Sequence, residues 1–223
     1  MARIAEELLL LLLDNASAQP EFDGVRRDRM LTAAVLLDLA HDCRIRPAVD
    51  GEPAEPGRLV ALSAPAGPLG PAQDTALQLL VRRPLRPADA IAKLRRATPA
   101  ALFWELEHHG LVQKVRLPGA WWRRRYSWPL TDRSRVAPMR DAMLAVLFDG
   151  EPPDPVTAAV ISLLHAVDGW DGLLSLSDRG WEWVRNRASE IASASWVDEP
   201  DAELPEFNLA VTLAGIRHAL QPS

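Results

Sequence analysis

The chain has 223 residues, of which 48% are hydrophobic and 25% are charged, and its formal net charge is −5. This composition supplies enough apolar side chains for one core, so we expect a single domain over residues 1–223. Cys43 is the only cysteine, which excludes a disulfide framework and a cysteine-based metal site and favours a reducing, cytoplasmic setting. The apolar run Leu8–Leu13 covers about a third of a bilayer, so it predicts neither a signal peptide nor a transmembrane helix.

Two apolar helices are predicted near the N-terminus. Residues 3–13 are apolar on nearly every face, which indicates a buried helix. Residues 26–42 form a second helix whose later half is again apolar. Asp38 lies in that apolar half, and a buried carboxylate needs partners, so we expect it to be a structural hydrogen-bonding residue.

The middle of the chain alternates loop and helix. Residues 44–71 are rich in proline and glycine and predict an extended loop that could hold an edge strand. Helices are expected at residues 71–81 and 87–97. Thr98 and Pro99 then suit the N-cap and first turn of a further helix that stops at Gly110.

A basic, aromatic β-hairpin is predicted over residues 112–128. The strand VQKVRL is followed by Pro118 and Gly119, which suit a type II turn, and then by AWWRRRYSW. Side chains alternate along a strand, so the returning strand presents two different faces. One face carries Trp122, Arg124, Tyr126 and Trp128, and the other carries Trp121, Arg123 and Arg125.

Helices dominate the remainder of the chain. We expect them at residues 135–148, from a cap at Asp154 and Pro155 onward, and at residues 181–196 and 205–220. The sum predicts a mainly α domain with one β-hairpin.

Charge is unevenly distributed along this domain. From Arg82 to Trp128, eleven Lys or Arg residues stand against three acidic ones, a local charge of +8 that leaves −13 for the rest. A basic region on an acidic protein is typical of contact with an anionic surface, either phospholipid or nucleic acid. The sequence assembles no catalytic or metal site, and we expect a protein without enzymatic activity and without a cofactor.

Three interpretations of the basic region remain open. Tryptophan and tyrosine favour the headgroup level of a bilayer and arginine favours anionic lipid, so the hairpin predicts peripheral membrane binding. Residues 87–128 could instead form a winged helix-turn-helix that binds DNA, although the helix before Gly110 brings Glu105 and Glu107 to the groove. The hairpin face could also form a homo-oligomer interface, where Trp, Tyr and Arg are enriched.

Five segments, in this order along residues 3–220, resemble the Golgi phosphoprotein 3 family. They are AEELLLLLLDN, AAVLLDLAHDCRI, EHHGLVQKV, DPVTAAVISLLHA and NRASEIA. The resemblance implies a domain built round a helix bundle, with a hydrophobic hairpin used for membrane insertion and self-association. It also implies binding of phosphatidylinositol 4-phosphate on the cytosolic face of a membrane; Golgi members of the family recruit the cytoplasmic tails of glycosyltransferases.

The resemblance transfers the headgroup pocket only in part. An ungapped match places Asp23 and Thr32 at the family's Trp and Arg, and Arg96 and Pro99 at its later basic pair. Three of these four positions therefore lack the family residue. Nearby arginines could rebuild an anion site, and the residues we predict for the lipid headgroup are Arg96, Arg95, Arg29 and Arg26.

The prediction from sequence is therefore a membrane adaptor of this family that binds anionic phospholipid. Lysine is nearly absent beside abundant arginine, a composition that favours a bacterial member. The expected setting is the cytoplasm and the cytosolic face of a membrane, with an unidentified protein cargo and with nucleic acid as the less favoured partner.

Overall fold

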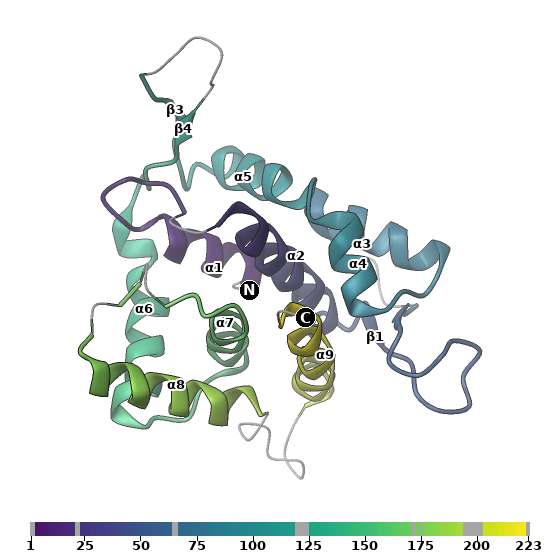
Figure 1. Ribbon diagram of the computed structural model, residues 1–223. Helices are drawn as coiled ribbons and strands as arrows, with labels where there is room; N and C mark the ends of the chain where they lie inside the picture. Colours follow the sequence, from purple (N-terminus) through teal and green to yellow (C-terminus); the bar gives the residue numbers. More distant parts are fainter. Residues whose placement is uncertain are drawn as a thin grey trace.

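The computed structural model describes residues 3–20, 23–63, 67–118, 125–170, 173–174, 176–193 and 203–221. Within them the chain is mainly α-helical, which confirms the predicted fold class (Figure 1). The α-helices are α1 (Ile4–Leu13), α2 (Gly24–His41), α3 (Pro71–Arg82), α4 (Pro87–Leu94), α5 (Thr98–His108), α6 (Ala137–Leu144), α7 (Pro155–Ala166), α8 (Asp178–Ala192) and α9 (Leu204–Leu220). Two short turns of other helix types flank α6: η1 (Arg133–Arg135), a 3-10 helix, and η2 (Ala145–Asp149), a π-helix. The strands form two antiparallel pairs, β1 (Ile45–Pro47) with β2 (Leu59–Ala61) and β3 (Val115–Arg116) with β4 (Tyr126–Ser127).

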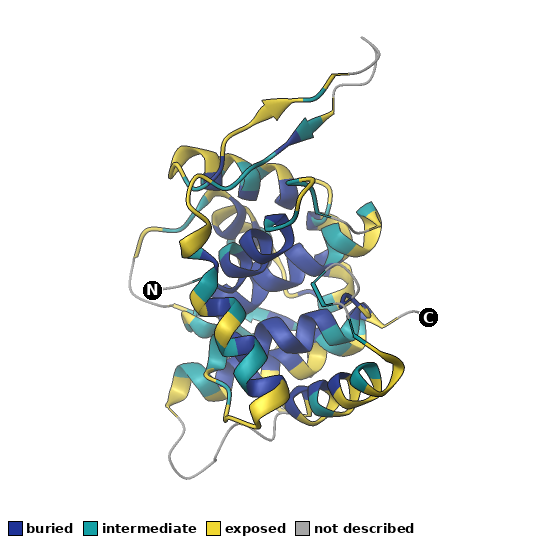
Figure 2. Cartoon of the chain, turned by 90° about the vertical axis from the view of Figure 1, so that its left-hand side faces the viewer, coloured by how far each residue is buried: buried dark blue, intermediate teal, exposed yellow. Residues whose placement is uncertain are grey.

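The core surrounds α1, α2 and α7. Every residue of α1 except Glu6 is buried, as are Met30–Ala40 of α2 and Thr157–Leu164 of α7. Helix α2 packs against α1, α7 and α9, so it runs through the middle of the bundle (Figures 1 and 2). The two apolar N-terminal helices predicted from the sequence are thus confirmed as core elements. Within the described residues, no helix is both long enough and apolar enough to cross a membrane.

Asp38 holds the start of α1 against α2. Its carboxylate accepts hydrogen bonds from the backbone N–H of Ile4 at 2.6 Å and of Ala5 at 3.3 Å. These are two of the N–H groups that the first turn of α1 leaves without a helical partner. Asp38 is therefore a structural hydrogen-bonding residue, as its apolar surroundings predict.

Several local predictions need correction, three of them in the middle of the chain. The loop at residues 44–71 contains the strand pair β1–β2, which joins Ile45 to Ala61 across the loop and was predicted only as an edge strand. Helix α4 ends at Leu94, three residues early, and Thr98 is not the cap of α5. An N-cap residue lies outside the helix and usually has an extended backbone, whereas Thr98 is itself the first residue of α5 and the preceding Ala97 already has helical backbone angles. The Thr98 hydroxyl donates to the Leu94 carbonyl, at the end of α4.

The helix predicted at residues 135–148 is divided into η1, α6 and η2. The carbonyl groups in the last turn of η2, which have no partner within a helix that ends at Asp149, are bound by α8: Trp183 Nε1 donates to the Leu147 carbonyl at 2.7 Å, and Arg187 Nε donates to the Val146 carbonyl at 3.2 Å. The segment ends at Gly150, which has φ 76°. In contrast, Asp154 caps α7 as predicted, because its extended backbone lets the carboxylate accept from the N–H of Val156 and Thr157.

The hairpin β3–β4 projects from the helical body. Figure 2 shows its two strands rising away from the buried, dark blue core, next to α5. In register, Val115 pairs with Ser127 and Arg116 pairs with Tyr126. The predicted turn at Gly119 lies outside the described residues. The hairpin therefore protrudes from the helical body, and its described strands carry part of the basic, aromatic sequence.

Candidate functional site

The base of the hairpin is held against α5 and against the loop that follows α1. The Trp128 ring stacks on the Phe103 ring of α5, with centroids 4.5 Å apart. The backbone N–H of Trp128 donates to the Ala18 carbonyl at 2.7 Å, and Gln19 Nε2 donates to the Tyr126 carbonyl at 3.1 Å. Since three parts of the chain meet at this base, the direction in which the hairpin projects is fixed by packing.

The described stem of the hairpin is cationic and exposed. Lys114, Arg116 and Arg125 are all exposed, and no acidic residue occurs in the sequence between Gly110 and Trp128. The ammonium group of Lys114 lies 4.6 Å from the centroid of the Tyr126 ring and 5.1 Å from that of Trp128, close enough for cation–π attraction. The aromatic side chains of Tyr126 and Trp128 thus hold a cation in place on the stem.

The structure separates the predicted membrane-contacting residues into two groups. Tyr126 and Trp128 are partly buried at the hairpin base, and Arg125 is exposed above them. The other predicted residues lie outside the described part of the chain: Trp121, Trp122, Arg123 and Arg124. For those four residues, insertion into a membrane stays a prediction.

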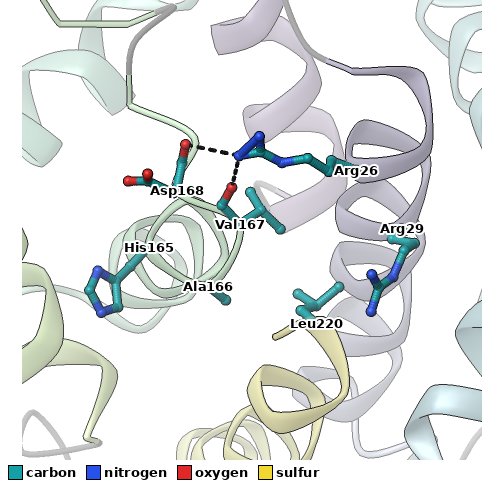
Figure 3. A pocket seen from close by; sticks show the side chains of 7 residues that line it. All are labelled: Arg26, Arg29, His165, Ala166, Val167, Asp168 and Leu220. Carbon is teal, nitrogen blue, oxygen red and sulfur yellow. Dashed lines mark hydrogen bonds between the residues drawn. The ribbon is translucent and has the colours of Figure 1, made fainter. Parts of the chain in front are cut away.

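Two of the predicted headgroup residues, Arg26 and Arg29, line one cavity. The cavity has a volume of about 430 Å³ and lies where the first turns of α2 meet the C-terminal ends of α7 and α9 (Figure 3). A guanidinium nitrogen of Arg26 donates to the carbonyls of Val167 and Asp168, and one of Arg29 donates to the carbonyl of Ala219 at 2.6 Å. These carbonyls belong to helix ends, where a cation is favoured by the helix dipole.

The other two predicted headgroup residues are not among the residues that line this cavity. Arg95 follows the last residue of α4 and is half-buried, whereas Arg96 is exposed in the turn before α5. Neither side chain has a hydrogen-bond or ion-pair partner within the described part of the chain. The structure therefore assembles Arg26 with Arg29, and it leaves Arg95 and Arg96 beside α4.

The positions aligned with the family pocket have structural roles here. The Asp23 carboxylate caps α2 by accepting from the N–H of Arg26. Thr32 is buried, and its hydroxyl donates to the Asp28 carbonyl at 2.7 Å. Pro99 is buried in the first turn of α5. These positions offer an arriving phosphate no cationic side chain apart from Arg96.

The residues that complete the Arg26 cavity could not be predicted from the sequence. Val167, Asp168 and Leu220 lie at the ends of helices that are distant in the sequence, and their contribution depends on how α7 and α9 pack against α2. Asp168 has a positive φ of 50° where the chain leaves α7, and no sequence motif predicts this conformation.

Helix α5 has the position that a DNA-recognition helix would occupy in the alternative interpretation. Its exposed side carries Trp104, Glu107 and His108, and the rings of Trp104 and His108 stack with centroids 4.9 Å apart. This surface offers an acidic residue and an indole where base-reading side chains are needed, so no observation favours that interpretation. The described residues also contain no group of three or more potential metal ligands.

A family model described as Golgi phosphoprotein 3 (GPP34) matches residues 4–204. The chain belongs to this family. The match begins at the start of α1 and ends at the first residue of α9, so it includes the hairpin and confirms the resemblance found in the sequence. No curated protein matches the chain in a sequence comparison.

Proposed function

We propose that this Golgi phosphoprotein 3 family member binds anionic phospholipid at a membrane surface through the hairpin β3–β4. The observation that carries the proposal is that the hairpin projects from the body and is held there by packing at its base (Figure 2). Its charged residues are all cationic, whereas the rest of the protein is acidic. Each arginine close to an anionic leaflet contributes about 1 kcal/mol of binding free energy. Indole rings at the tip would add interfacial affinity, since tryptophan favours the headgroup level.

Packing at the base supports this role. A hairpin of two short strands is marginal on its own, and the contacts of Trp128 with Phe103 and Ala18 supply the missing stability. The aromatic residues nearest the body thus anchor the hairpin, while Trp121 and Trp122, which follow the predicted turn in the sequence, are the ones we propose to meet the membrane. The protein then acts as an adaptor, by binding and without catalysis.

Further features belong to the same proposal. Family membership supports phosphatidylinositol 4-phosphate as one lipid to test, on the cytosolic face of a membrane. The arginine-rich composition supports a bacterial source, and the protein cargo that the adaptor would bind is unidentified. A tryptophan-rich tip also suits self-association of the protein through the hairpin.

Co-sedimentation with vesicles tests the proposal. Phosphatidylcholine vesicles containing increasing fractions of phosphatidylserine or phosphatidylinositol 4-phosphate should pellet increasing amounts of protein, and added salt should reduce the amount. The double variant Trp121→Ala, Trp122→Ala should pellet poorly. Phe207→Ala is the control, because this aromatic side chain is 48% exposed on α9 and lies outside the hairpin.

Two results would contradict the proposal. One is pelleting that depends neither on lipid charge nor on the two tip tryptophans. The other is a salt-sensitive and sequence-dependent shift of DNA in a gel, which would support the winged-helix alternative.

A further inference from the structure

The cavity between α2, α7 and α9 combines an apolar side with a cationic side. Ala166, Val167 and Leu220 supply the apolar surface, and Arg26 and Arg29 supply the charge (Figure 3). Its volume of about 430 Å³ is within the range of sites that hold small organic molecules. The cavity is therefore large enough for an anion that carries an organic group.

The two arginines are held in place but are not neutralised. Their hydrogen bonds to the helix-end carbonyls occupy one terminal nitrogen of each guanidinium, and a guanidinium has five N–H donors. Within the described part of the chain, neither has an ion-pair partner, whereas the intervening Arg27 contacts Asp28 at 2.7 Å. Arg26 and Arg29 therefore keep both their charge and free donors at the cavity.

Further titratable and charged groups lie around the cavity. His165 lies at its edge, and burial, together with the nearby charges of Arg217 and Arg185, lowers the pKa of the imidazole, although Asp168 opposes the shift. Asp168 is the carboxylate that lines the cavity, and Figure 3 shows its side chain turned away from the Arg26 guanidinium. That carboxylate lies 3.8 Å from Arg185. The one carboxylate in the lining is therefore paired with Arg185 and not with Arg26 or Arg29.

We propose that this cavity binds the phosphate group of a phosphate monoester, with the organic part of the ligand against Val167 and Leu220. Guanidinium groups bind phosphate through paired, charge-assisted hydrogen bonds, and two arginines one turn apart on α2 can approach one ligand from the same side. None of Asp23, Thr32, Arg96 and Pro99 lines the cavity, so it is distinct from the positions aligned with the family's headgroup pocket. The described residues of the hairpin do not line it either, so this site is distinct from the hairpin strands β3 and β4.

Calorimetric titration of the whole protein with soluble ligands tests the site without any membrane. The probes are glycerol 3-phosphate, a free phosphate ester, and dihexanoyl phosphatidic acid below its micelle concentration, which carries the same group on a lipid. Dihexanoyl phosphatidylcholine is the ligand control, because it has no phosphate monoester. Variants Arg26→Gln and Arg29→Gln remove the charge but keep an amide donor for the helix-end carbonyls, and Arg27→Gln is the matched control. Circular dichroism and thermal unfolding establish that each variant folds.

Binding of a phosphate monoester should weaken about tenfold for each of Arg26→Gln and Arg29→Gln and by less than twofold for Arg27→Gln. Equal affinity for both phosphate probes identifies a free phosphate ester as the ligand, and binding of dihexanoyl phosphatidic acid alone identifies a lipid headgroup. Absence of binding to both probes, or unchanged affinity in the folded Arg26 and Arg29 variants, overturns the proposal. The double variant Trp121→Ala, Trp122→Ala should bind the phosphate probes as the parent protein does. Failure of the cavity proposal can therefore be distinguished from failure of the proposed membrane binding.

Discussion

Replacing Asp38 with asparagine should remove a large pH dependence of the protein's stability. Burial raises the pKa of Asp38 from 3.8 to about 7, against the lowering effect of the N–H groups of Ile4 and Ala5. The folded protein thus holds this proton more tightly than the unfolded chain between pH 4 and pH 7. The contribution of protonated Asp38 to the free energy of unfolding is fully present below pH 4 and is lost as the pH rises to 7. The pKa difference of about three between the folded and the unfolded protein corresponds to about 4 kcal/mol.

Urea unfolding of the parent protein and of Asp38→Asn at several pH values between 4 and 8 measures this effect. The difference in unfolding free energy between the two proteins isolates Asp38, since the other titrating groups are common to both. We expect that difference to change by about 4 kcal/mol in favour of the variant as the pH rises. The variant Asp141→Asn, at an exposed position of α6, should show no such change. A difference that stays constant within about 1 kcal/mol would refute the reasoning.

Three further substitutions test the packing around the site. Trp128→Ala should lower the free energy of unfolding by about 2 kcal/mol, because it removes the stack on Phe103; a thermal midpoint equal to that of the parent would contradict this. Arg135→Gln should cost about 3 kcal/mol in urea unfolding, since it leaves Glu7, whose side chain is 4% exposed, without its cation; a loss below 1 kcal/mol would show that Glu7 does not need the pair. Asp154→Ala should cost about 1 kcal/mol in the same assay through loss of the cap of α7, and rescue by Asp154→Ser would confirm that mechanism.

Local patterns in the sequence predicted much of the helical fold. The unbroken apolar run in α1 and the apolar second half of α2 allowed only buried helices, and both form the core. The cap at Asp154 could be predicted from the sequence because its hydrogen bonds involve neighbouring residues alone. Thr98 failed as a cap because its role depends on the helical turn that joins α4 to α5, which the sequence does not determine locally.

Local sequence patterns could not predict the contacts between distant segments. The pairing of β1 with β2 joins residues on both sides of a proline-rich loop and has no tight turn to signal it. Arg26 and Arg29 could be named from their charge, but the carbonyls that orient them come from α7 and α9, some 140 and 190 residues later. The hairpin was predictable as an element, whereas its anchoring on Phe103 and Ala18 was not.

The central claim is that the hairpin, and not the basic region in general, binds the membrane. Its most direct test compares the vesicle partition coefficients of two double variants, Arg116→Gln with Arg125→Gln on the hairpin and Arg82→Gln with Arg83→Gln at the end of α3. All four arginines are exposed, so each pair removes the same charge. At about 1 kcal/mol for each arginine near the lipid, the hairpin pair should lower partitioning into anionic vesicles about 30-fold, and the α3 pair less than threefold. Equal losses from the two pairs would contradict the account.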